Sequence, residues 1–164
     1  MHRTKALRAH QTFVTDNWLG GLYGSSGVLG TKSGGSIAAA WAVMHHLGDD
    51  GYLRVAAAAR RATEALVAVV HSAPELSLRA EPDAMLIAVG AADPAQLDVF
   101  AVADRLWTRG WYVDRQGPPA SLHFTVNAIH DGLIDAFAVD LRAAIDEVLV
   151  TNDTGAAGAY GTVE

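Results

Sequence analysis

The stretch GGLYGSSGVLGTKSGG, residues 20–35, decides how this chain is organised. It holds seven glycines in sixteen residues and leads directly into an apolar, Ala-rich segment that starts at Ser36. Because glycine has no Cβ, such a backbone can come very close to an anion or to another subunit. Residues 1–35 sustain neither the period of a strand nor that of a helix, which predicts an arm that needs a surface to lie on.

Within this stretch, Gly30-Thr31-Lys32-Ser33 is more typical of a general anion cradle than of a nucleotide site. Ser33 can cap the helix that follows, and the free N–H groups of that helix would attract negative charge beside Lys32. A phosphate loop needs a glycine directly before the lysine, a defined spacer and a preceding strand, and all three are missing. Gly24-Ser25-Ser26-Gly27 likewise lacks the closing glycine of a serine nucleophile elbow. A flexible connector remains the alternative interpretation.

Composition excludes several classes of protein. The 164 residues suffice for one domain with its own core, and the absence of cysteine excludes a disulfide scaffold and thiolate chemistry. Twelve Lys and Arg against 18 Asp and Glu give a net charge of -6, which argues against a nucleic-acid or anionic-membrane surface. No apolar run reaches the roughly 18 residues of a membrane helix, and the N-terminus lacks a signal-peptide core. We therefore expect a cytoplasmic protein.

Beyond the arm, hydrophobic periodicity predicts an α+β fold, a mainly antiparallel sheet with helices on one face. The predicted elements are, in order, a helix from Ser36 ended by Gly48, a second helix capped by Asp49 or Asp50 and stopped at Ser72-Ala73-Pro74, strands over 76–80 and 85–89, a helix opened by Asp93-Pro94 and ended by Gly110, strands over 111–115 and 121–127, and a helix capped by Asp131. The buried face of that last helix is expected to carry Ile134, Phe137, Ala138, Leu141, Ile145, Val148 and Leu149.

These patterns divide the chain into an arm over residues 1–35, an α+β domain over 36–150 and a flexible tail over 151–164. The domain offers few signs of catalysis. Its histidines are scattered, so we expect no metal site, and its carboxylates show no pairing suited to acid–base chemistry. By composition and spacing alone, the chain is an α+β domain with an arm suited to an anion.

The sequence HRTKALRAHQTFVTDNWLGGLYGSSGVLGTKSGGSIAAAWAVMHHLGDDGY, residues 2–52, resembles a segment of the sphingosine phosphate lyases and related group II decarboxylases. The matching landmarks keep their order: His10-Gln11, Trp18-x-Gly20-Gly21-x-Tyr23, a Gly-hydroxyl-basic triplet at 30–32, Gly34-Gly35, Trp41 in an Ala-rich helix, and Gly48-x-x-Gly51-Tyr52. The likeness continues through Gly110-Trp111, Pro118-Pro119-x-Ser121-Leu122-His123 and the tail from Thr154-Gly155 to Tyr160-Gly161. It covers nearly the whole chain.

The resemblance implies the C-terminal small domain of a fold type I enzyme that uses pyridoxal phosphate, together with the arm that joins it to the large cofactor domain. In this family a lysine that follows a histidine holds the cofactor as a Schiff base, and the cofactor acts as electron sink while a bond at the substrate's Cα breaks. Here only Lys5 and Lys32 exist, and each follows a threonine. The resemblance therefore implies a chain that is inactive alone.

By position, the resemblance assigns cofactor binding to Tyr23, Gly30, Thr31 and Lys32, and it assigns no catalytic residue to this chain. Lys32 stands where the family has an arginine, so the charge is kept while the planar fork that binds phosphate through two hydrogen bonds is lost. We expect a homodimer, or a complex with a chain that carries the lysine. The alternatives are a non-catalytic oligomerisation or small-ligand module and, third, an independent phosphate-binding enzyme.

Overall fold

The computed structural model describes residues 4–17, 19–25 and 33–156. The chain forms two compact units, Met1–Gly48 and Asp49–Glu164. The longest helix, α2 (Gly34–Ser72), runs through the boundary and changes direction there at Gly48. Within the described ranges, no helix combines the length and the apolar character that crossing a membrane requires.

The described residues of the first unit form a short helix, two short strands and the first half of α2. Helix α1 (Lys5–Gln11) starts behind Thr4, whose hydroxyl accepts a hydrogen bond from the Leu7 amide at 3.3 Å. Strands β1 (Phe13–Thr15) and β2 (Tyr23–Ser25) pair antiparallel, with Phe13 opposite Ser25. None of the described residues of this unit is buried. Short elements with no apolar core depend on a partner surface for their stability.

Gly48 divides α2 into two helical halves, as the sequence predicts. Its backbone has φ 57° and ψ -177°, a combination that an L side chain avoids and glycine adopts at little cost. The first half, up to residue 47, belongs to the first unit and the half from Asp49 onward belongs to the second.

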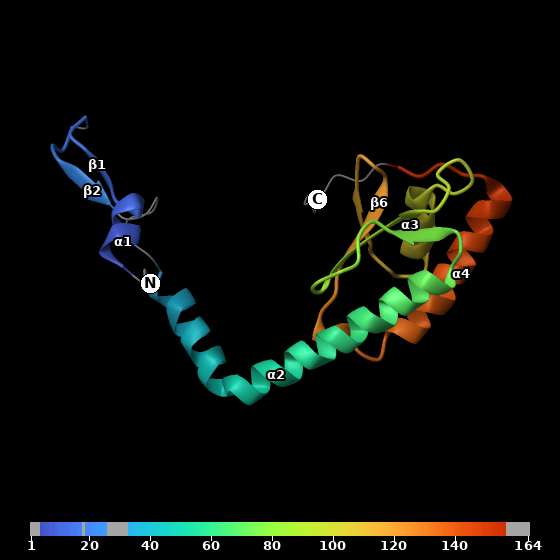
Figure 1. Cartoon of the computed structure of the whole chain (residues 1–164), viewed down its shortest axis with the longest axis horizontal. Helices are drawn as coiled ribbons and strands as arrows, with labels where there is room; N and C mark the ends of the chain where they lie inside the picture. Colours follow the sequence, from blue (N-terminus) through green and yellow to red (C-terminus); the bar gives the residue numbers. More distant parts are fainter. Residues whose placement is uncertain (1–3, 18, 26–32, 157–164) are drawn as a thin grey trace. The chain divides into compact units, whose positions relative to one another are not determined.

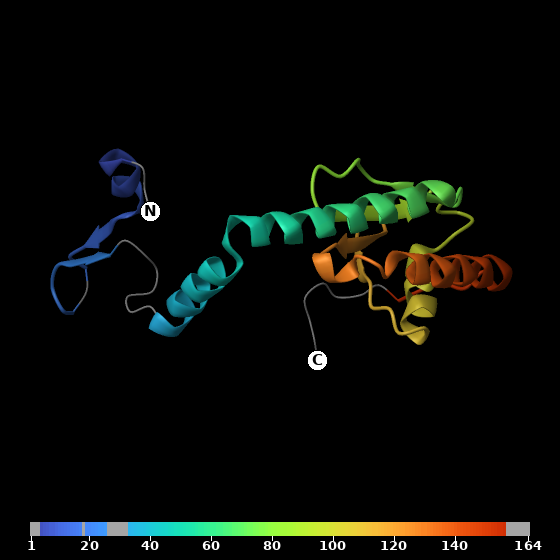
Figure 2. The same cartoon turned by 90° about the horizontal axis from the view of Figure 1, so that it is seen from below.

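The second unit is an antiparallel sheet with helices. The sheet has the order β3 (Leu76–Leu78), β4 (Leu86–Ala91), β6 (Ser121–Thr125) and β5 (Asp114–Gln116), with every neighbouring pair antiparallel. A 3-10 turn, η1 (Ala128–His130), leads into α4 (Ile134–Thr151), which packs beside α3 (Val99–Thr108) (Figures 1 and 2). The predicted α+β architecture is confirmed.

Strand alternation gives this sheet two different faces. Ile87 and Val89 of β4 lie opposite Phe124 and Leu122 of β6, and these four residues pack into the apolar core with side chains of α2, α3 and α4. Residues on the intervening positions point to the other face, here called the far face. Its members include Ala88, Gly90, Ser121 and His123. The core side chains of the helices include Leu66, Val70, Val102, Leu106, Phe137, Leu141, Ile145 and Val148.

The start of α3 differs from the prediction. The Asp93 side chain accepts hydrogen bonds from the Ala95 amide and the Gln96 side chain, both at 2.9 Å, and so closes a turn instead of opening a helix. Helix α3 begins five residues later, with Asp98 as its N-cap and the Phe100 amide 2.8 Å from the Asp98 carboxylate. A proline after an aspartate suits a turn as well as a first helical position, and the local sequence does not separate the two.

Asp131 is not the cap of α4, contrary to the prediction. Gly132, with φ 88°, separates it from the helix, whose N-cap is Leu133. The Asp131 carboxylate instead lies 2.6 Å from the guanidinium of Arg61 on α2. A second contact of this kind joins Arg142 of α4 to Glu75 just beyond α2, through two hydrogen bonds at 2.9 and 3.1 Å. These pairs join α2 to the turn before α4, and α4 to the turn after α2.

Candidate functional site

The arm residues that the sequence assigns to cofactor binding are described only in part. Tyr23 lies on β2 opposite Thr15, and its side chain is 39% exposed. Gly30, Thr31 and Lys32 lie outside the described residues. Their part in cofactor binding therefore stays a prediction, and Tyr23 is placed at the edge of a small hairpin that leads toward them.

Lysine is the residue that a covalently bound pyridoxal phosphate requires, and the described part of the chain does not supply one in a suitable place. Lys5 is exposed on α1. Three cavities open on the second unit, with volumes of about 450, 270 and 510 Å³, and none of them is lined by a lysine. The described residues therefore do not make up a complete site for pyridoxal phosphate.

The cavity of about 270 Å³, called the His123 cavity, lies between β5, β6 and the start of α4. Phe137 forms its aromatic wall with Trp111 and Phe124, both in edge-to-face contact with it at centroid distances of 5.2 and 5.8 Å. The Trp111 indole N–H donates to the Asp140 carboxylate at 2.7 Å, which fixes the ring. Aromatic walls of this kind hold an apolar group.

Polar side chains line the other side of the His123 cavity. Asp114 and His123 are directly opposite each other on β5 and β6. The Asp114 carboxylate hydrogen-bonds the Tyr112 hydroxyl and thereby raises the pKa of Tyr112. The raised pKa extends to more alkaline pH the range over which the phenol can donate this hydrogen bond. The sequence singles out His123 only as a landmark of the family resemblance, because the cross-strand register that sets it beside Asp114 has no local signal. No cluster that could hold a metal ion occurs among the described residues.

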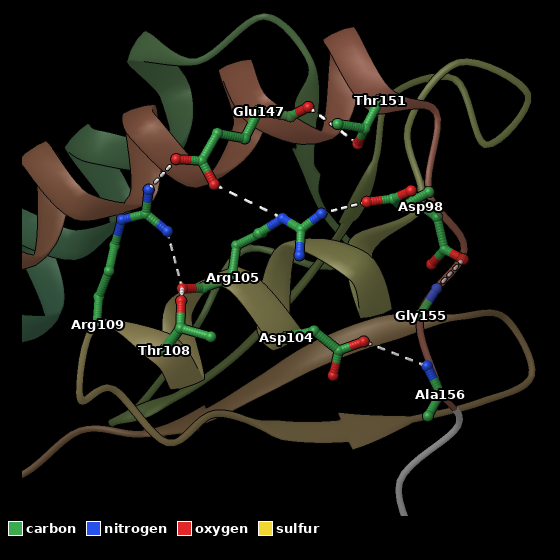
Figure 3. A network of polar contacts seen from close by, with 10 residues as sticks. Asp98, Asp104, Arg105, Thr108, Arg109, Glu147, Thr151, Gly155 and Ala156 are labelled. Carbon is green, nitrogen blue, oxygen red and sulfur yellow. Dashed lines mark hydrogen bonds and ion pairs between the residues drawn. The ribbon is translucent and has the colours of Figure 1, made fainter.

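A polar network fixes residues 152–156, called the C-terminal strap, against α3 (Figure 3). The Gly155 amide donates to Asp98 at 3.0 Å, so the carboxylate that caps α3 also binds the strap. The Ala156 amide donates to Asp104 at 3.4 Å, and Arg115 of β5 bridges Asp104 and the Ala156 carbonyl.

Arginines of α3 extend this network to α4. In Figure 3 the side chains of Arg105 and Arg109 point toward Glu147 of α4, and both form ion pairs with it. Arg105 also pairs with Asp153 of the strap. The sequence predicts a flexible tail over residues 151–164. In the structure Thr151 ends α4 and residues 152–156 form the hydrogen-bonded strap. Residues 157–164 lie outside the described residues. No local pattern predicts these contacts, because they join residues far apart in the chain.

The α+β fold of this chain also occurs within a solved lyase and a solved decarboxylase. No protein-family model matches the chain. A solved structure of glutamate decarboxylase from Lactobacillus brevis shares the fold, with a TM-score of 0.67 and 18% identity over 84% of this chain and 33% of that one. The solved sphingosine-1-phosphate lyase of Burkholderia pseudomallei matches with a TM-score of 0.79 and 33% identity, over 92% of this chain and 34% of that one.

The particular relationship follows from the sequence match. The chain is 33% identical over 148 residues to the sphingosine-1-phosphate lyase of Arabidopsis thaliana, which covers 90% of this chain and 27% of the relative. The chain is homologous to the sphingosine-1-phosphate lyases, and the resemblance predicted from the sequence is confirmed. It spans about a quarter to a third of the length of these relatives.

Proposed function

We propose that this chain is the C-terminal part of a pyridoxal-phosphate-dependent carbon–carbon lyase or amino-acid decarboxylase, and that it is inactive alone. The observation that carries the proposal is the homology over 90% of the chain to enzymes of which it spans only 27%. Bound pyridoxal phosphate supplies an electron sink for breaking a bond at the substrate's Cα. The Schiff-base lysine comes from a polypeptide region outside this sequence.

Exposed apolar side chains support a partner for this chain, either a second copy or a polypeptide that carries the lysine. In the first unit, apolar side chains are exposed on α1, on β1, between β1 and β2, and over the first half of α2; they are Leu7, Phe13, Val14, Leu19, Leu22, Ile37, Trp41, Val43 and Met44. A unit whose described residues include none that is buried and this many exposed apolar side chains gains stability when another surface covers it. We propose that the complete assembly is dimeric and cytoplasmic.

Tyr23, Gly30, Thr31 and Lys32 are proposed to contact the cofactor phosphate or the substrate from across the subunit interface. A lysine ammonium is a point charge, whereas an arginine would bind phosphate through two parallel hydrogen bonds. In the reconstituted complex, Lys32→Ala should weaken cofactor binding and Lys32→Arg should preserve it. Unchanged binding in Lys32→Ala would remove this residue from the site.

Native mass spectrometry of the chain isolated from its own cells, followed by borohydride reduction, tests the proposal. Borohydride fixes pyridoxal phosphate on the lysine that holds it, and peptide mapping identifies that lysine. We expect a larger co-isolated polypeptide that carries the label and no label on Lys5 or Lys32. Label on either of these two lysines would contradict the proposal.

The second candidate function is a non-catalytic oligomerisation or small-ligand module. The absence of a lysine from the three cavities favours it. A homo-oligomer isolated without pyridoxal phosphate or a labelled partner would support this module and exclude the complemented enzyme.

A further inference from the structure

The far face of the sheet has one corner where small residues leave room above the strands. Ser77 of β3 lies opposite Gly90 of β4, and Gln116 of β5 lies opposite Ser121 of β6. Val89 of β4 is paired with Leu122 of β6, so Gly90, which follows Val89, lies opposite Ser121, which precedes Leu122. Ser77, Gly90, Ser121 and Gln116 therefore form one row across the four strands. Because one residue of this row is glycine and two are serines, their side chains leave space above the sheet at this corner.

Arg79 lies over this floor. Its backbone amide continues the β3–β4 ladder by donating to the Ala88 carbonyl at 2.8 Å. Its side chain lies above Gly90, because a Cβ added to Gly90 would stand 2.0 Å from the Arg79 Nη2 atom. The same Nη2 donates to the Ala120 carbonyl at 2.7 Å, which fixes the guanidinium across the sheet. Any residue larger than glycine at position 90 would displace it.

Arg79 differs from most arginines of the second unit in having no carboxylate partner among the described residues. The arginines with such a partner within 4.0 Å are Arg60, Arg61, Arg105, Arg109, Arg115 and Arg142. A guanidinium has five N–H donors, and the hydrogen bond to Ala120 uses one of them. Arg79 thus presents a fixed positive charge with donors to spare.

A cavity of about 510 Å³ opens beside this guanidinium. It is lined by Arg79, Gln116, Ser121 and the turn residues 117–119, and it contains no acidic side chain. The Gln116 amide donates to the Ser121 hydroxyl at 3.4 Å and keeps a second N–H for another acceptor. The lining of this cavity therefore carries one positive charge, that of Arg79, while Asp98 and Asp153 line the neighbouring cavity of about 450 Å³ that Arg79 also borders.

We propose that this cavity, called the Arg79 corner, binds a small oxyanion, either a carboxylate or a phosphate group, with Arg79 as its main ligand. The planar fork of a guanidinium matches two oxygens of either group through parallel, charge-assisted hydrogen bonds. Gly90 provides the space for that fork and the Gln116 amide supplies a further donor. This site is formed by residues of this chain, and its binding of an oxyanion requires neither pyridoxal phosphate nor the proposed function.

Titration of the full chain with inorganic phosphate and with acetate, followed by two-dimensional NMR, tests the Arg79 corner. We expect saturable shifts of the Arg79 side-chain N–H and of the amides at Gln116 and Ser121 with at least one of the two anions. The anion that binds more tightly identifies the ligand class. Absence of saturable shifts with both anions would overturn the proposal.

Variants separate this site from general charge effects. Arg79→Ala should weaken anion binding by about tenfold or more, because it removes charge-assisted hydrogen bonds. Arg54→Ala removes the same charge from an exposed position on α2 and should leave the affinity unchanged. Equal loss in both variants, or none in Arg79→Ala, would contradict the proposal. Gly90→Ala, which displaces the guanidinium while keeping the charge, should behave like Arg79→Ala.

Discussion

Gly155→Ala is predicted to release the C-terminal strap from α3. A Cβ at this position would stand 2.1 Å from both the Ala101 nitrogen and the Phe100 carbonyl carbon. These are backbone atoms at the start of a helix, so a change of side-chain rotamer cannot relieve the overlap. The strap must move away, and the hydrogen bonds from Gly155 to Asp98 and from Ala156 to Asp104 are then lost.

The expected loss of stability follows from those contacts. Two amide-to-carboxylate hydrogen bonds and the contact of Arg115 with the Ala156 carbonyl hold this part of the strap. A net value of about 0.5–1.5 kcal/mol for each of the two amide bonds, which already includes the hydrogen bonds regained with water, gives about 1–3 kcal/mol. Helix α3 itself should persist, since Asp98 still caps it through the Phe100 amide.

Hydrogen exchange and chemical denaturation together measure this effect. We expect faster exchange at the amides of Gly155 and Ala156, unchanged exchange in the centre of α3, and a lower free energy of unfolding. Gly34→Ala is the matched control, because a Cβ there meets nothing within 4 Å. Unchanged exchange of the strap in Gly155→Ala would refute the reasoning, because the added methyl would then fit where the structure leaves no space.

Three further substitutions test the core, an ion pair and the kink. Leu106→Ala, at a position that is 0% exposed, should lower the free energy of unfolding by about 2–5 kcal/mol, whereas Val150→Ala, at 82% exposure, should change it by less than about 0.5 kcal/mol in the same denaturant titration. Hydrogen bonds from Arg142 hold the pKa of Glu75 below its ordinary value of 4.5, so this pair stabilises the fold above that pH and its contribution is lost as pH falls through the lower folded-state pKa. Glu75→Gln should therefore reduce stability near pH 7 by about 1 kcal/mol or less and flatten the acid limb of the stability curve; an unaltered acid limb would contradict this. Gly48→Ala should lower the free energy of unfolding by about 1–3 kcal/mol or straighten α2, because alanine avoids the φ of 57° at this position. Circular dichroism followed during thermal unfolding measures both effects, and the absence of both would contradict this prediction.

Much of the second unit could be predicted from the sequence because its signals are local. The buried face of α4 follows the 3.6-residue period, and Ile134, Phe137, Leu141, Ile145 and Val148 are all buried as predicted. Gly48 and Gly110 have the positive φ values expected where a helix ends. The predicted helix starts at Asp93 and Asp131 were wrong, because an aspartate closes a turn or binds a distant arginine as readily as it caps a helix.

The candidate sites depended on information that no sequence window contains. Tyr23 was singled out by the family resemblance and the glycine-rich stretch by its glycine content as well, whereas the Asp114–His123 pair and the Arg79 corner required the register of β3, β4, β5 and β6. An arginine just beyond a short strand, such as Arg79 after β3, has no local pattern that reveals whether a carboxylate lies nearby. That depends on which strands become neighbours.

The sequence by itself determined the α+β class, the kink at Gly48 and the relationship to the lyases, since helix periods, glycine conformations and family landmarks are written in consecutive residues. Only the tertiary structure decided that Gly90 makes room for Arg79, 11 positions before it, and that Asp98 binds a strap 57 positions beyond it. Local hydrogen bonding and hydrophobic period reach over a few residues. Contacts across such distances exist only after loops have closed and strands have paired in register.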